Sequence, residues 1–290
     1  MRSESLLLSE AGGDYLSWHN DDRIGRKREM RDTVVQMRGV SWLREKSYIL
    51  SGIDWNVEAG EHWAIVGLNG SGKTTLLNMV TGYIFPSEGE VTVLGKKFGT
   101  YDLRELRKSI GWVSSSLMER LMTNEKVEDI ILSGKFGSIG LYEHPSGTLR
   151  QRAADLMEQF GCMNLASRVY STLSQGEKQK VLIARALMSS QRILILDEPC
   201  TGLDILARES LLTLIEEIGT AKNAPTLLYV SHHVEEILPV FTRTVLLRKG
   251  RIHSSGNSDG VLSRSNLTDF FERPVEIAWR KSRPWIHLLD

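Results

Sequence analysis

Short apolar runs separated by polar turns begin only after about the first 32 residues of the chain. The opening segment is polar and charge-rich, as in the run HNDDRIGRKREMRD, so we predict a flexible N-terminal extension over residues 1–32. The apolar runs that follow predict strands, and a helix should lie between the last two of them, over GKTTLLNMVTG. The predicted strands cover residues 33–37, 53–57, 62–66 and 90–95.

Helical patterns dominate the next part of the chain. The helix predicted over GKTTLLNMVTG has its apolar residues on one face, and Gly82 stands where a helix commonly ends. Residues 114–172 are mainly helical in pattern and contain no convincing long strand. Within them, Thr148 is expected to cap a helix that Gly161 ends.

Strands and helices alternate in the second half of the chain. RILILD is a continuous apolar run, typical of a strand buried in a parallel sheet, and LARESLLTLIEEIG is helical. TLLYVS is the next predicted strand, VEEILPVF a broken helix, and TVLLRKGRIHSSG a pair of strands. This alternation predicts an α/β fold with a parallel core sheet. A tail of mixed pattern, residues 257–290, follows and is expected either to pack or to dock.

Composition narrows the function classes. The 290 residues hold 36 Lys+Arg and 36 Asp+Glu, and this zero net charge argues against a protein that coats nucleic acid. The two cysteines, Cys162 and Cys200, form no CxxC pattern, so we expect small buried side chains in a reducing cytosol. No apolar run approaches the ~18–20 residues that span a bilayer. Any membrane role is therefore expected to need a partner.

The run GLNGSGKT, from Gly67 to Thr74, matches the spacing G-x-x-x-x-G-K-[ST]. A predicted strand precedes it and a predicted helix follows, the context that a phosphate-binding loop requires. Backbone N–H groups would surround a phosphate, Lys73 would reach the β- and γ-phosphates, and the Thr74 hydroxyl would bind Mg²⁺. The predicted nucleotide-binding residues are Gly67, Leu68, Asn69, Gly70, Ser71, Gly72, Lys73, Thr74 and Thr75.

Two later strands end in groups suited to hydrolysis. RILILDEP delivers Asp197 to the carboxyl end of its strand, where it would hold Mg²⁺, and Glu198 is placed to act as general base on water. LYVSHH ends a neighbouring strand, so His232 or His233 can reach the same edge. Of the two, His232 is favoured as the sensor of the γ-phosphate.

A second helix start also suits an anion. In STLSQGEKQK, Ser174 is the expected N-cap and Glu177 follows three residues later, which is a capping box. Such a start exposes N–H groups and the positive end of the helix dipole. The chain already has a phosphate loop, so this pattern leaves open whose phosphate the second helix would meet.

In their order along the chain, these motifs closely resemble those of the ATP-binding cassette (ABC) ATPases. GLNGSGKT is similar to the family's Walker A motif, LSQGE to its signature, ILILDEP to Walker B, TGLD to the D-loop with Asp204, and His232 to the switch histidine. The resemblance covers roughly residues 33–256 and is strongest to single-cassette bacterial ABC transporter ATP-binding proteins.

The resemblance implies the fold, the cofactors and the partners. It implies a P-loop NTPase (RecA-like) core with an antiparallel β subdomain and an inserted helical subdomain, and an ATPase that uses ATP and Mg²⁺. Two copies would pair head to tail, so that one copy's signature covers ATP held by the other. The residues assigned to the partner's ATP are Ser174, Gln175, Gly176 and Glu177.

Two positions depart from the family pattern. Ser115 in IGWVSSS stands where the family has the Q-loop glutamine, which contacts Mg²⁺ or the lytic water and reports on the membrane partner. The aromatic residue that stacks on adenine has no direct match: Arg44 occupies its place and Trp42 lies two residues earlier. Either side chain could stack on the base, and Trp42 could equally be a core residue.

Three functions remain open at this point. The leading one is an ATPase subunit that drives a separate membrane permease, on the cytoplasmic face of the membrane, with the helical segment as docking groove. A soluble ABC ATPase with a cytosolic target is the alternative, which Ser115 favours. A nucleotide switch that barely hydrolyses ATP would need a damaged catalytic residue, whereas Lys73, Glu198 and His232 are all present. No nucleic-acid partner is expected.

Overall fold

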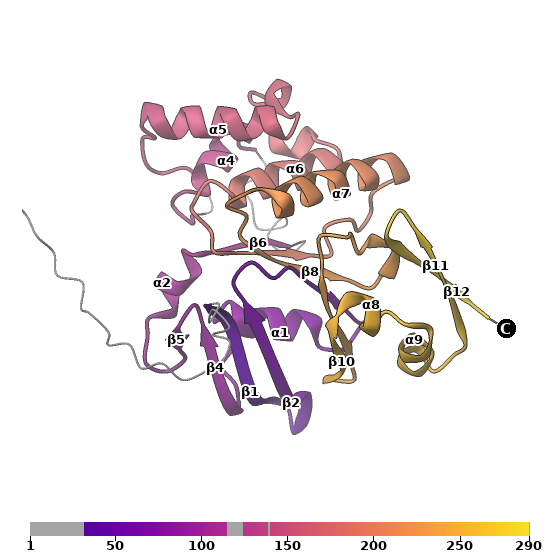
Figure 1. The fold of residues 1–290 in the computed structure, drawn as a ribbon. Coiled ribbons are helices and arrows are strands. Elements are labelled where there is room, and N and C mark those ends of the chain that lie inside the picture. The colour runs from indigo at the N-terminus through magenta and orange to yellow at the C-terminus, as the bar shows by residue number, and fades with distance from the viewer. Residues whose placement is uncertain (1–31, 115–123, 139, 290) are drawn as a thin grey trace, which may run out of the picture. The chain divides into compact units, whose positions relative to one another are not determined.

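The computed structural model describes residues 32–114, 124–138 and 140–289 (Figure 1). The position of Ser115 and most of the predicted N-terminal extension lie outside these residues. Within them, no helix is both long enough and apolar enough to cross a membrane. Both cysteines are buried and unpaired, as the sequence predicts.

The core is a six-stranded sheet in the described part of the chain, with strand order β10-β9-β3-β8-β7-β6. All its strands run parallel except β10, which pairs antiparallel with β9. The predicted parallel α/β core is therefore confirmed. The strands are β3 (Trp63–Val66), β6 (Ile110–Ser114), β7 (Ile193–Asp197), β8 (Thr226–Ser231), β9 (Arg243–Arg248) and β10 (Arg251–Asn257).

Alternating side chains of the core strands enter two separate apolar clusters. In β7, Leu194 and Leu196 join one cluster, whereas Ile193 and Ile195 join the other, and all four are fully buried. A strand covered on both faces has to be apolar at every position, which explains the continuous run RILILD. The carboxyl ends of β3, β7 and β8 lie side by side, since β8 pairs with both neighbours.

A four-stranded antiparallel sheet packs with one of these clusters. It consists of β1 (Thr33–Arg44), β2 (Ser47–Glu58), β4 (Glu88–Val93) and β5 (Lys96–Lys97), in the order β2-β1-β4-β5. The predicted strands 33–37 and 53–57 are parts of longer strands. Bulges interrupt the pairing of β1 with β2, so the full length of these strands does not follow a regular alternation in the sequence. The helices α1 (Lys73–Val80) and α2 (Leu103–Arg107) contribute buried residues to the same cluster.

Helices cover the opposite face of the core sheet (Figure 1). Ser146, not Thr148, caps the predicted helix of the insert, since the Ser146 hydroxyl accepts a bond from the Leu149 N–H. Gly161 follows that helix with φ +61°, so its predicted end is confirmed. The elements are α4 (Val127–Ser133), α5 (Gly147–Gln159), η1 (Met163–Leu165), η2 (Tyr170–Thr172), α6 (Gln175–Ala186) and α7 (Ile205–Thr220).

The segment after β8 and the tail complete the fold. VEEILPVF forms only a 3₁₀ turn, η3 (Val234–Glu236), so the predicted broken helix is wrong; Pro239 lacks an N–H and disfavours a helical conformation before it. The tail packs on the core, because Leu267, Phe270 and Val275 are buried in the cluster that also holds the helices of the insert. It contains α8 (Ser258–Val261), α9 (Arg264–Phe271) and a hairpin of β11 (Val275–Arg280) and β12 (Arg283–Leu288).

Candidate active site

A pocket of about 560 Å³ opens at the carboxyl edge of the core sheet. The loop after β3, the start of α1 and the end of β7 together form its walls. The structure thus brings most of the predicted Walker A residues together with Asp197 and Glu198, 124 and 125 positions later than Lys73 in the chain. The lining residues are Ile49, Asn69, Gly70, Ser71, Gly72, Lys73, Thr74, Thr75, Ser114, Asp197 and Glu198.

Helix α1 begins in the pocket without a side-chain cap. Its N-cap is Gly72, with φ 104°, a left-handed conformation that a residue with Cβ would adopt only under strain. A Cβ at this position would also lie 2.8 Å from Leu50 Cδ2. The first N–H groups of a helix have no acceptor within the helix, so those of α1 can bind an anion in the pocket.

Lys73 is held by the loop that it follows. Its ammonium donates hydrogen bonds to the carbonyl oxygens of Gly67 at 2.7 Å and Leu68 at 3.3 Å, and lies 3.3 Å from Glu198 Oε1. The side chain is only 6% exposed. A buried cation with fixed partners is a strong attractor for the oxygens of a phosphate.

The end of β7 carries two adjacent carboxylates. Burial, with a smaller contribution from the charge of Glu198, raises the pKa of Asp197 to about 6. Glu198 has φ 51°, and a left-handed conformation of this kind costs on the order of 1 kcal/mol in a residue with a side chain. The Glu198 N–H donates to the Val230 carbonyl at 2.9 Å, and this bond ties the residue after β7 to the neighbouring strand β8.

The structure distinguishes the two histidines that follow β8. His232 Nδ1 lies 3.4 Å from Glu198 Oε1, whereas His233 Nδ1 lies 3.3 Å from Glu235 Oε1 on the next turn. His232 and Lys73 thus contact the same carboxylate oxygen of Glu198. His232 therefore lies at the catalytic edge of the sheet, and its role as sensor of the γ-phosphate stays a prediction.

The predicted capping box at the start of α6 is confirmed. Ser174 accepts a bond from the Glu177 N–H, and Glu177 Oε2 accepts one from the Ser174 N–H at 2.7 Å. Gly176 lies against α7, because a Cβ there would be 3.2 Å from Ala207 Cβ. The signature residues, Gln175 included, are not among the residues that line the pocket.

Asp204 occupies a structural position at the start of α7. It is the N-cap of this helix, and its carboxylate accepts a bond from the Ala207 N–H at 2.9 Å. The D-loop residue and the signature helix are therefore adjacent through Ala207.

The residues predicted to stack on adenine lie outside the lining of the pocket. Neither Trp42 nor Arg44 is among the residues that line the pocket; Trp42 packs partly buried against the apolar cluster and Arg44 is exposed. Ile49 and Ser114, which no motif identifies, do line it. Stacking of Trp42 or Arg44 on the base stays a prediction.

The oxygen donors present fit Mg²⁺. Thr74 and Asp197 both line the pocket and offer a hydroxyl and a carboxylate. No group of three or more His, Cys, Asp or Glu residues among those described forms a complete cage for a metal ion. Mg²⁺ commonly binds through one or two protein oxygens and completes its shell with phosphate and water, so this donor set suits it.

Comparisons with known proteins agree with this geometry. The family model described as "ABC transporter" matches residues 50–201. The chain is 48% identical to the ABC transporter ATP-binding protein YlmA of Bacillus subtilis (strain 168), over 87% of this chain and 96% of YlmA. It is 42% identical to the ABC transporter ATP-binding protein YmeB of Lactococcus lactis, over 84% of this chain and 95% of YmeB.

Solved structures show the same fold. CbiO1 from Clostridium perfringens, part of the ABC transporter complex CbiONQ, superposes with a TM-score of 0.71 at 25% identity, covering 82% of this chain and 94% of CbiO1. A dimeric post-hydrolysis state of the ATP-binding cassette MJ0796, bound to ADP and Pi, gives 0.66 at 26% identity, covering 77% and 98%.

The fold and the site define a P-loop ATPase of the ATP-binding cassette class. The chain belongs to the family of ABC transporter ATP-binding proteins, and it binds and hydrolyses ATP.

Proposed function

We propose that two copies of this chain close head to tail around two Mg²⁺-ATP molecules and thereby drive a separate membrane permease. The single observation that carries the proposal is the convergence on Glu198. Lys73 Nζ and His232 Nδ1 lie 3.3 and 3.4 Å from its Oε1, at the edge of a pocket lined by the phosphate loop. A carboxylate held between these groups is placed to take the proton of an attacking water.

The polar groups of the site have separate proposed roles in this reaction. Backbone N–H groups at the start of α1 and the Lys73 ammonium bind the β- and γ-phosphates. Thr74 and Asp197 hold Mg²⁺, which when bound neutralises charge on the phosphates. Glu198 orients and deprotonates the water. His232 contacts the γ-phosphate and the Glu198 carboxylate and keeps their relative position fixed.

The exposed signature supports pairing with a second copy. Ser174 and its neighbours form a helix start outside the pocket of their own chain, so a nucleotide would reach them from another molecule. Large apolar side chains next to the motifs are exposed: Leu68 by 52%, Ile205 by 70% and Leu206 by 82%. Such side chains beside the phosphate loop and the D-loop suit burial in a dimer. The dimeric relative MJ0796 with ADP and Pi supports the same arrangement.

The permease and the location on the cytoplasmic face are the finer part of the proposal. The relatives named ABC transporter ATP-binding proteins, and CbiO1 as part of a transporter complex, support a membrane partner. Ser115 in place of the Q-loop glutamine favours the alternative, an ABC ATPase with a cytosolic target. Co-purification of a multi-span membrane protein with the intact chain from detergent-treated membranes would favour the permease, and its absence the alternative.

The test of the catalytic assignment is Glu198→Gln. The amide cannot accept a proton from water, so we expect ATP turnover to fall by ~100-fold or more, while ATP affinity stays close to that of the wild type. Glu217→Gln, on the exposed side of α7, is the matched control. Turnover of Glu198→Gln equal to that of the control would show that Glu198 is not the base.

A further inference from the structure

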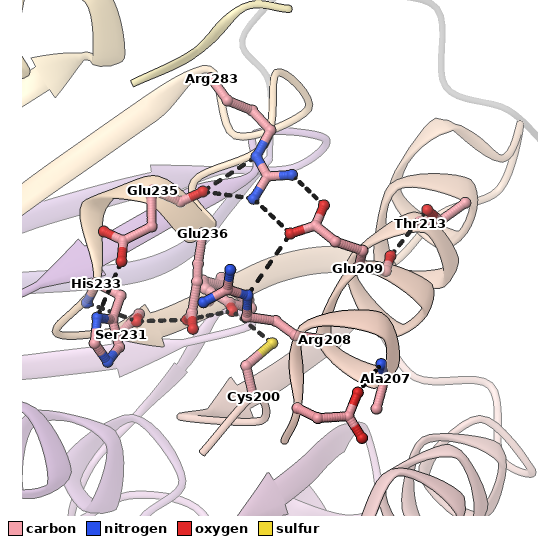
Figure 2. Close-up of polar contacts among 12 residues, drawn as sticks. Cys200, Ala207, Arg208, Glu209, Thr213, Ser231, His233, Glu235, Glu236 and Arg283 are labelled. Carbon is pink, nitrogen blue, oxygen red and sulfur yellow. Dashed lines mark hydrogen bonds and ion pairs between the residues drawn. The ribbon is translucent and has the colours of Figure 1, made fainter. Parts of the chain in front are cut away.

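The C-terminal hairpin reaches back to two segments that flank the catalytic groups, through one side chain, Arg283 (Figure 2). Its Nη1 donates to Glu209 Oε2 at 2.6 Å and its Nη2 to Glu209 Oε1 at 3.3 Å. Its Nε and Nη2 also donate to the main-chain carbonyl of Glu235, at 3.1 and 2.7 Å. The Arg283 side chain is 14% exposed and that of Glu209 43%, so these contacts are partly buried.

The two segments that Arg283 joins are the ones that carry Asp204 and His232. Glu209 lies on the second turn of α7, the helix that Asp204 caps. Glu235 lies in η3, three residues after His232. The arginine therefore ties the helix of the D-loop to the loop of the switch histidine.

The loop of the switch histidine is also fixed from its other side. The buried carboxylate of Glu236 accepts bonds from the Tyr229 hydroxyl at 2.8 Å and the Ser231 hydroxyl at 2.7 Å. Ser231 Oγ in turn accepts a bond from the His233 N–H at 2.9 Å. With β8 holding one side of this loop, the Arg283 contact with Glu235 restrains the other.

The geometry of the contact needs a guanidinium. Arg283 makes a bidentate pair with a carboxylate and at the same time chelates a carbonyl, which requires several N–H groups in one plane. A lysine ammonium keeps the charge but cannot fill both positions. The hydrogen bonds from Arg283 are the main cause that lowers the pKa of Glu209, so Glu209 is ionised and the pair is charged at neutral pH.

We propose that Arg283 is a positioning residue for ATP hydrolysis: by joining Glu209 of α7 to the carbonyl of Glu235, the C-terminal hairpin holds the D-loop helix and the His232 loop in the geometry that hydrolysis requires. The inference rests on the proposed role of His232. It assigns to the tail a function in turnover rather than in nucleotide binding, because none of the residues that line the nucleotide pocket belongs to the tail.

The test is the steady-state ATPase activity of the full chain with Arg283→Met. We expect kcat to fall ~10-fold, because small displacements of catalytic groups are costly, with KM for ATP changed by less than about twofold. Arg283→Lys should be intermediate. Glu209→Gln should lower kcat in the same direction, and it tests the same contact with an almost unchanged side-chain shape.

Arg280→Met is the matched control. Arg280 lies opposite Arg283 in the register of the hairpin, and its side chain is exposed. A kcat for both Arg283→Met and Glu209→Gln equal to that of Arg280→Met would overturn the inference. So would a change in KM alone, or a kcat loss that Arg283→Lys does not lessen at all. Thermal unfolding of each variant shows whether a loss of kcat accompanies a loss of folded protein, in which case Glu209→Gln decides.

The failure of this inference can be told apart from the failure of the proposed function. If Glu198→Gln loses turnover while Arg283→Met and Glu209→Gln keep it, only the positioning role is wrong. If Glu198→Gln keeps its turnover, the assignment of the base fails first, whatever the Arg283 variants do.

Discussion

Helices α1 and α6 both begin at motifs that the sequence assigns to phosphate, and the two helix starts differ in how they are capped. Helix α1 starts at Gly72 with no side-chain cap and opens into the nucleotide pocket. Helix α6 starts at Ser174 with a complete capping box, outside the pocket of its own chain.

The difference separates a pocket that one chain forms by itself from a helix start that, in our proposal, meets the nucleotide of a second chain. The uncapped N–H groups of α1 and the buried Lys73 line a pocket within the same molecule. In α6 the helix start is already stabilised by Ser174 and Glu177, so it does not need a ligand to fold, and the positive end of its dipole still faces outward from the pocket of its own chain. The comparison predicts that changes at α1 abolish ATP binding, whereas changes at α6 abolish hydrolysis alone.

The largest expected effect belongs to Lys73→Ala. Loss of a charge-assisted contact in a shielded pocket removes about 3 kcal/mol, so ATP should bind at least ~100-fold more weakly. Equilibrium titration with a fluorescent ATP analogue measures this. Lys222→Ala, in the exposed turn after α7, is the control, and equal affinity of the two variants would contradict the phosphate-loop assignment.

An effect of similar size, but on hydrolysis alone, is expected at Gly176. A carboxylate there would face the γ-phosphate of the partner's ATP, so Gly176→Asp should lower hydrolysis by ~100-fold or more through repulsion. Gly176→Asn is the control, because both side chains place a Cβ 3.2 Å from Ala207 Cβ and differ mainly in charge. ATP binding should be normal in both. Equal hydrolysis rates in the two variants would argue against a phosphate at this helix start.

The smallest expected effect is the loss of stability when either of two serine caps is removed. Ser174 and Ser146 have the same backbone angles, φ −64° and ψ 162°, and each caps a helix through its hydroxyl. Either serine replaced by alanine should cost about 1 kcal/mol of unfolding free energy, measured by denaturant titration. Only Ser174→Ala should also lower ATPase activity. A loss of activity in Ser146→Ala would show that helix stability, not phosphate contact, sets the rate.

The sequence predicts those parts of the fold that local patterns determine. The apolar run before Asp197 predicts a buried parallel strand, because a strand covered on both faces must be apolar throughout. The capping box at Ser174 is local in the same way, since both of its partners lie within four residues.

Contacts between segments distant in sequence could not be predicted in this way. Ile49 lines the nucleotide pocket because β2 carries it to the loop after β3, and no local pattern marks that position. Arg283 is 74 positions from Glu209, and the tail in which it lies has no recognisable period. The prediction that Thr148 caps α5 is wrong for a local reason. Ser146 lies two residues earlier, and its hydroxyl accepts the hydrogen bond from the Leu149 N–H.

The most direct test of the central claim is the mass of Glu198→Gln in solution, by analytical ultracentrifugation with and without saturating Mg²⁺-ATP. We expect a single chain without nucleotide and a pair with ATP, and the same pair should fail to form when Gly176→Asp is added. A Glu198→Gln protein that binds ATP yet stays a single chain at saturation would contradict the claim that the signature of one copy closes on the ATP of the other.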